Sequence, residues 1–151
     1  MYHIHKFITI WIFILVIFHN ITSIFFSLPY LTFMVFINGL YLSYINPRKY
    51  YIEYYDDNNE KSIIIIDGIN KNIVDIIFHI IPFIFIYLIY GFESFFTNWK
   101  IIPSLILLFI YLLIYNPANI YHIHINTITI LSFISIILYI FLNFIVNYKR
   151  I

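Results

Sequence analysis

The sequence predicts an all-α integral membrane protein: a helical bundle of about five transmembrane helices with one polar loop. Composition is the first reason. Of the 151 residues, 63% are hydrophobic and only 10% are charged, whereas soluble domains average about 45–50% apolar and about 25% charged residues. The second reason is that the charged residues are clustered, which leaves long uncharged runs between them. We therefore expect a single membrane domain over residues 1–151 and no soluble enzyme fold.

The first uncharged run predicts two spans. It holds 41 residues between Lys6 and Arg48, and a helix needs only about 20 residues to cross a hydrocarbon core of roughly 30 Å. Pro29 marks the break, because proline cannot donate to the preceding turn but begins a new helix well. The expected spans are 7–27, which is too long for the apolar region of a cleaved signal peptide, and 29–46.

Two more uncharged runs follow the polar loop. The shorter run, bounded by Asp75 and Glu93, is sufficient for one span. The longer run has 48 residues and is interrupted at Asn116-Pro117, a pair that ends helices, so it divides into two spans. The three spans expected here are 76–92, 101–116 and 126–146.

Residues 47–72 form the polar loop. Two runs rich in isoleucine and tyrosine flank a cluster of aspartate and asparagine at 56–59, a pattern typical of a β-hairpin. Because an isolated hairpin is marginally stable in water, we expect it to lie on the bundle or on a partner. The alternative is a flexible tether between two spans.

Five spans place the N-terminus, the 47–72 loop and the 116–125 loop on the same face of the membrane. That face carries more lysine and arginine residues than the opposite face, which predicts a cytosolic N-terminus. The residues on the two faces are Lys6, Arg48, Lys49, Lys61 and Lys71 against Lys100, Lys149 and Arg150.

Composition also excludes several kinds of site. A formal net charge of +1 gives no electrostatic basis for a nucleic-acid partner. The absence of cysteine excludes disulfides and thiolate chemistry, and three isolated glycines leave no phosphate-binding loop. We predict no cofactor. The expected partners are the lipid bilayer and either a second copy of the chain or another membrane protein.

Histidines raise one metal hypothesis. Tyr2-His3-Ile4-His5 recurs as Tyr121-His122-Ile123-His124, and alternate histidines of an extended segment point the same way. Both copies lie on one face in the five-span topology, so four imidazoles could converge on zinc or copper. We favour the alternative, in which these are interfacial histidines and no metal binds.

Asp75 and His79 are the candidate catalytic pair. Their i, i+4 spacing places both side chains on one helix face, where a carboxylate can fix the tautomer and basicity of an imidazole. Ionisable groups inside membrane segments are costly and often functional. In the alternative interpretation, Asp75 caps the N-terminus of the helix and His79 bonds to a backbone carbonyl.

Three short motifs resemble one family of membrane proteins. Tyr30-Leu31-Thr32-Phe33 resembles a segment of the FAR-17a/androgen-induced-protein-like family, and Asp75-x3-His79-x2-Pro82 is similar to its histidine-bearing helix. Tyr115-Asn116-Pro117 resembles a Tyr-Pro element that follows another helix of that family. Some members hydrolyse fatty-acid esters with a threonine nucleophile and a histidine. The resemblance, over about a dozen positions, implies these roles for Thr32 and His79.

The overall composition has a second resemblance. Isoleucine occurs 40 times and alanine once, and the abundant residues are those encoded by A/T-rich codons. Uncharacterised multi-pass proteins of large DNA viruses look similar, which implies a host or viral membrane as the location.

Two functions follow from these observations. The first is a non-enzymatic integral membrane protein with a structural or interaction role, which recruits partners through 47–72. The second is a membrane-embedded lipid hydrolase in which His79 is the base, Asp75 orients it and Thr32 is the nucleophile. Five spans put Thr32 and His79 about 20 Å apart in depth, whereas a nucleophile and its base approach to about 3 Å. We therefore favour the non-enzymatic role.

Overall fold

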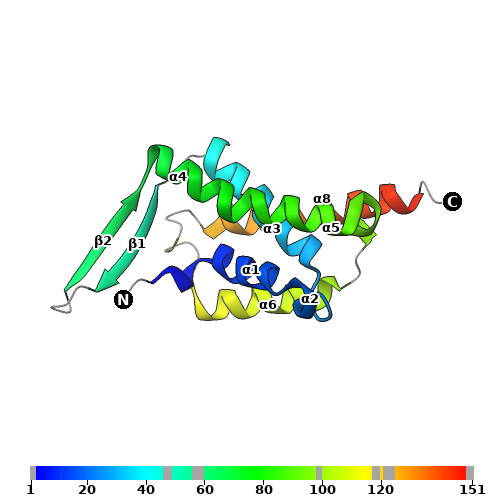
Figure 1. The fold of residues 1–151 in the computed structure, drawn as a ribbon, viewed down its shortest axis with the longest axis horizontal. Helices are drawn as coiled ribbons and strands as arrows, with labels where there is room; N and C mark the ends of the chain where they lie inside the picture. Colours follow the sequence, from blue (N-terminus) through cyan, green and yellow to red (C-terminus); the bar gives the residue numbers. More distant parts are fainter. Residues whose placement is uncertain are drawn as a thin grey trace.

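The chain folds into a mostly helical bundle with a two-stranded antiparallel hairpin at one end (Figure 1). The long helices run back and forth along the long axis, with the N-terminus beside the hairpin and the C-terminus at the far end. An all-α fold and a hairpin in the polar segment are therefore confirmed. The computed structural model describes residues 3–45, 49–55, 60–97, 100–116, 120 and 125–148.

The N-terminal part is broken into short helices, where the sequence predicts one span over 7–27. A 3₁₀ turn, η1 (Ile4–Lys6), precedes α1 (Ile8–Ile17) and α2 (His19–Thr22). The break has a polar cause. The hydroxyl of Thr22 donates to the backbone carbonyls of Leu15, at 2.7 Å, and Phe18, at 3.1 Å, and side-chain bonds of this kind compete with the regular helical ladder.

Helix α3 (Leu28–Leu40), continued by the π-helical segment η2 (Tyr41–Ile45), forms the core of the bundle. Ser27 caps its N-terminus by accepting a hydrogen bond from the backbone N–H of Tyr30 at 3.3 Å, as Ser at an N-cap does. Over the span of α3 and η2, 56% of the residues are buried, against 22% in each of the other two long apolar helices. Helices α1, α5, α6 and α8 pack around α3.

The hairpin consists of β1 (Tyr50–Tyr55) and β2 (Lys61–Ile66), which pair in antiparallel register. Contacts with Glu53 attach it to the N-terminal segment. The backbone N–H of His3 donates to the carbonyl of Glu53 at 2.9 Å, and the Glu53 carboxylate pairs with Lys6 at 2.8 Å and with Lys61 at 2.6 Å. The hairpin thus lies against the start of the chain rather than acting as a free tether.

The third long segment begins at Gly68, eight residues before the expected start at 76. It comprises α4 (Gly68–Asp75), the π-helical segment η3 (Ile76–Ile80) and α5 (Ile81–Thr97). Asp67 caps it by accepting from the N–H of Gly68 at 2.8 Å. Pro82 provides no N–H for the carbonyl four residues earlier, and the helix widens into its π segment just before this proline.

The remaining helices are α6 (Ile101–Ile114) and α8 (Ile125–Tyr148). The turn before α3 is fixed to the start of α6: the N–H of Ser27 donates to the hydroxyl of Ser104 at 2.8 Å, and Lys100 Nζ donates to the carbonyl of Ser23 at 2.8 Å. These bonds close the end of the bundle opposite the hairpin.

Three helices in the described ranges are long and apolar enough to cross a membrane: Leu28–Ile45, Gly68–Phe92 and Thr129–Tyr148. The apolar helices α1 and α6 are shorter. Large apolar side chains cover the outside of the bundle, as shown by Leu88, Leu113 and Phe133, which are 74%, 71% and 62% exposed. An apolar surface of this extent is typical of a protein that contacts lipid.

Acid should release the hairpin from the N-terminal segment. Hydrogen bonds from Lys6 and Lys61 lower the pKa of Glu53 from 4.5 to about 2. Because the folded pKa lies below the unfolded one, this carboxylate stabilises the attachment fully above about pH 4.5, and the contribution is lost as the pH falls toward 2. Nitroxide labels on cysteines at His5 and Ile64 should give a narrow distance distribution at pH 6 and a broad one at pH 2.

The variant Glu53→Gln is the matched control for this titration. It keeps the shape of the side chain but cannot ionise, so its distance distribution should not change between the two pH values. If wild type and variant respond identically to acid, the Glu53 contacts do not hold the hairpin.

Candidate functional site

The carboxylate of Asp75 is the hub of a buried polar cluster. Lys71 Nζ lies 2.5 Å from Oδ2, the hydroxyl of Ser43 donates to Oδ2 at 2.6 Å, and the hydroxyl of Tyr50 donates to Oδ1. The side chains of Lys71 and Asp75 are only 7% and 8% exposed. A buried charge is destabilising unless it is paired and hydrogen-bonded, and Asp75 satisfies both conditions.

These partners come from three different segments of the chain. Ser43 lies in η2 after the core helix, Tyr50 is the first residue of β1, and Lys71 precedes Asp75 by one turn in α4. Burial, together with the hydrogen bond to Asp75, raises the pKa of Tyr50 above its ordinary range, so its hydroxyl remains a donor. Lys71 Nζ also lies 5.2 Å from the centre of the Tyr50 ring, within the range of a cation–π contact. One carboxylate thus joins the core helix, the hairpin and the long helix.

His79 lies on the other side of Asp75. Its Nδ1 is 3.3 Å from Asp75 Oδ1, without the geometry of a hydrogen bond, and this buried nitrogen has no hydrogen-bond partner in the described part of the chain. The ring packs on the backbone of Gly39, where an added Cβ would lie 2.5 Å from His79 Cγ. The structure therefore brings together the two residues that the sequence singled out as a pair, and only glycine fits opposite the histidine.

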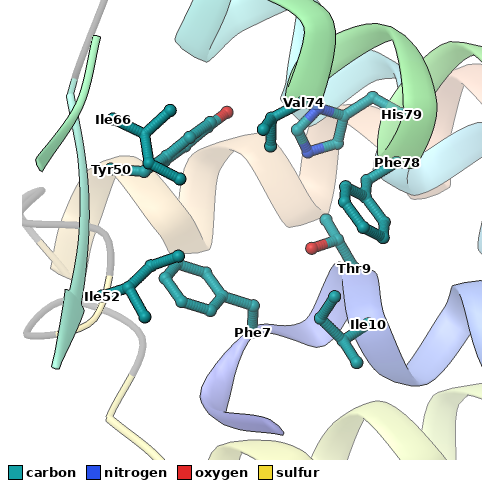
Figure 2. A pocket seen from close by; sticks show the side chains of 9 residues that line it. All are labelled: Phe7, Thr9, Ile10, Tyr50, Ile52, Ile66, Val74, Phe78 and His79. Carbon is teal, nitrogen blue, oxygen red and sulfur yellow. The ribbon is translucent and has the colours of Figure 1, made fainter. Parts of the chain in front are cut away.

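A pocket of about 260 Å³ opens beside this histidine. It lies between the start of α1, the hairpin and the long helix, and the imidazole of His79 and the hydroxyl of Thr9 both face it (Figure 2). The other lining groups are apolar or aromatic, because the Tyr50 hydroxyl is bonded to Asp75. The nine lining residues are Phe7, Thr9, Ile10, Tyr50, Ile52, Ile66, Val74, Phe78 and His79.

Thr32 does not lie beside this pair. It is fully buried, and its hydroxyl donates to the carbonyl of Leu28 at 2.8 Å. Gly39, against which His79 packs, follows Thr32 by seven residues on α3, which corresponds to about 10 Å along the helix axis. The separation between Thr32 and His79 along the helix axis is smaller than the sequence predicts. It is still too large for proton transfer between their side chains.

Sequence reasoning missed four polar residues of this region. Lys71 could have been found, because its i, i+4 spacing from Asp75 is a recognised pairing signal. Tyr50, Ser43 and Thr9 carry no such signal, since they come from segments far from Asp75 in the sequence.

The histidine hypothesis is only partly covered by the structure. His3 and His5 lie close, with ring centres 5.5 Å apart, whereas His122 and His124 lie outside the described residues. No group of three metal-binding side chains occurs in the ranges that the structure describes.

The chain matches no protein-family model, no curated protein and no solved structure in the three comparisons made.

Removal of the Asp75 carboxylate should strongly destabilise the fold. Asp75→Ala leaves the Lys71 ammonium buried without its counter-charge, a change that costs about 3–5 kcal/mol. Unfolding by denaturant in detergent micelles should show this loss. The double variant Lys71→Met/Asp75→Asn removes both charges and should recover most of it.

Two results would contradict this description of the cluster. One is a loss below about 1 kcal/mol for Asp75→Ala, the size typical of exposed ion pairs. The other is a double variant as unstable as the single one.

Proposed function

We propose that this chain is a five-pass integral membrane protein with a structural or interaction role, in which the Asp75 cluster fixes the hairpin at the end of the bundle as a docking element for a partner. The observation that carries the proposal is the Asp75 carboxylate itself. It accepts hydrogen bonds from Ser43, Tyr50 and Lys71 at once. These contacts join the end of the core helix and the hairpin to the long helix.

The arrangement of the helices supports five passes. The segments α1, α3, α4 to α5, α6 and α8 alternate in direction along the long axis (Figure 1). Helix α6 has 14 residues, about 21 Å of helix, and α1 has 10, about 15 Å. Both fall short of a roughly 30 Å core. The turns η1 and α2 lengthen the first pass, and local thinning of the bilayer accommodates short spans.

We place the hairpin end on the cytosolic side. The N-terminus and the hairpin lie at the same end of the bundle in Figure 1, and the loops at this end carry the excess of lysine and arginine that marks cytosolic loops. Lys71, counted with the loop from sequence, is buried within α4 and is left out of this count. The basic residues that the sequence assigns to this face are then Lys6, Arg48, Lys49 and Lys61, against three that it assigns to the other face.

A lipid-ester hydrolase is the second candidate. The close approach of Asp75 and His79 beside an apolar pocket favours it, and so does the family resemblance noted in the sequence. The non-catalytic role is better supported, because Thr32 lies about two helical turns from the level of His79.

Topology is tested by cysteine labelling in sealed vesicles, since the chain contains no cysteine. Single cysteines at Ile63 on the hairpin and at Ile24 on the turn before α3 are both accessible, at 54% and 62% exposure. An impermeant maleimide should label them from opposite sides of the membrane, and Tyr148→Cys should react from the same side as Ile24→Cys. A cysteine at the buried Val35 is the control and should react only after denaturation.

Labelling of the Ile63 and Ile24 cysteines from the same side would contradict five passes. Five passes place one membrane crossing, that of α3, between these two positions, whereas labelling from one side requires an even number of crossings.

Catalysis is tested with His79→Gln, which retains a polar side chain of similar size. A structural protein should keep its expression level and its thermal stability to within a few degrees, and turnover of a fatty-acid ester in its micelles should equal the background of empty micelles for both forms. Turnover that is present in wild type and lost in His79→Gln would instead support the hydrolase.

A further inference from the structure

Two polar groups face the pocket, the buried imidazole of His79 and the hydroxyl of Thr9. His79 is 6% exposed. Its Nδ1 is turned toward Asp75, so the ring nitrogen turned toward the pocket in Figure 2 is Nε2. The pocket thus offers one ring nitrogen and one hydroxyl among apolar and aromatic side chains.

The position of Asp75 determines which ring nitrogen of His79 is left for a ligand. An ionised carboxylate only accepts, and the carboxylate of Asp75 faces Nδ1 at 3.3 Å. Nε2 is therefore the ring nitrogen that remains for a ligand. A hydroxyl group can both donate and accept a hydrogen bond, so it is a suitable partner for Nε2.

The charge balance excludes an anionic ligand. The positive charge of Lys71 is neutralised by Asp75 at 2.5 Å. Lys6 and Lys61 do not line the pocket, and both pair with Glu53. An ionised carboxylate or phosphate would enter a largely apolar pocket whose lining holds no lysine or arginine to neutralise its charge, which is strongly unfavourable.

The volume and place of the pocket define the rest of the ligand. About 260 Å³ is larger than a cavity of about 150 Å³ that holds benzene and lies just below the roughly 300–1,000 Å³ of sites for drug-sized ligands. A pocket of this volume suits a ligand with one alkyl chain and not a lipid with two alkyl chains. The pocket lies where the helices meet the hairpin (Figure 2), the level at which a membrane amphiphile has its polar end.

We propose that this pocket binds a single-chain, uncharged amphiphile of the long-chain alcohol class. Its hydroxyl forms a hydrogen bond with Nε2 of His79, and the Thr9 hydroxyl faces the same pocket as a second polar group. The alkyl chain lies against Phe7, Ile10 and Phe78. This binding role goes beyond the structural role proposed above and requires no catalysis.

The test uses the full chain in lipid nanodiscs and 1-dodecanol that carries a diazirine in its chain. After irradiation, labelled peptides should come from the start of α1, the hairpin and residues 74–79, and excess unlabelled dodecanol should abolish this labelling. Dodecanoate at neutral pH should compete at least tenfold less well. Labelling spread over α5, α6 and α8 that dodecanol does not reduce would overturn the proposal, and so would equal competition by dodecanoate.

Two neighbouring positions provide matched variants. Val74 lines the pocket, whereas Ile73 next to it is 49% exposed on the outer face. Val74→Phe should fill the pocket and reduce saturable labelling at least tenfold, and Ile73→Phe should leave it unchanged. Equal labelling of the two variants would overturn the proposal.

The role of the hydroxyl is tested with a probe that lacks it. Wild type should prefer the diazirine alcohol to the corresponding diazirine alkane, and His79→Leu should bind both equally. If wild type shows no preference for the alcohol, His79 does not bind a hydroxyl.

Discussion

One buried carboxylate links the parts of this molecule. Asp75 lies where the end of the core helix, the first residue of the hairpin and the long helix meet, and each provides a donor to it. A charge in this position is tolerated only while it is paired and hydrogen-bonded. The geometry of the hairpin, the π segment after α3 and the first turns of α4 therefore depend on one another. The hairpin and the long helix also line the pocket beside His79.

Close packing around α3 fixes the positions of the neighbouring helices. Gly39 lets the His79 ring approach the core helix, and aromatic contacts between α3 and α5, such as Phe36 stacked on Phe83 at 4.3 Å, hold the two helices in register. At the opposite end, Ser27 and Ser104 join α3 to α6. The apolar outer surface is then free to contact lipid, which agrees with the low charge content of the sequence.

Much of this arrangement could be predicted from the sequence, because it depends on local signals. Pro29 marks the start of the core helix, and the Asp/Asn cluster separates two β-prone runs that do form a hairpin. The early start of the long helix at Gly68 was missed, because Lys71 looks like a loop charge until it is seen paired with Asp75. Tyr50, Ser43 and Thr9 could not be predicted, since tertiary contacts alone bring them to the site.

A double-mutant cycle between Tyr50 and Asp75 tests most directly whether this carboxylate holds the hairpin on the bundle. Tyr50→Phe removes one hydroxyl, Asp75→Asn removes the charge, and unfolding free energies of the four forms give their coupling. The structure predicts a coupling within the range of about 0.5–3 kcal/mol seen for residues in contact. A coupling indistinguishable from zero would contradict it, because the hairpin would then be held by other contacts.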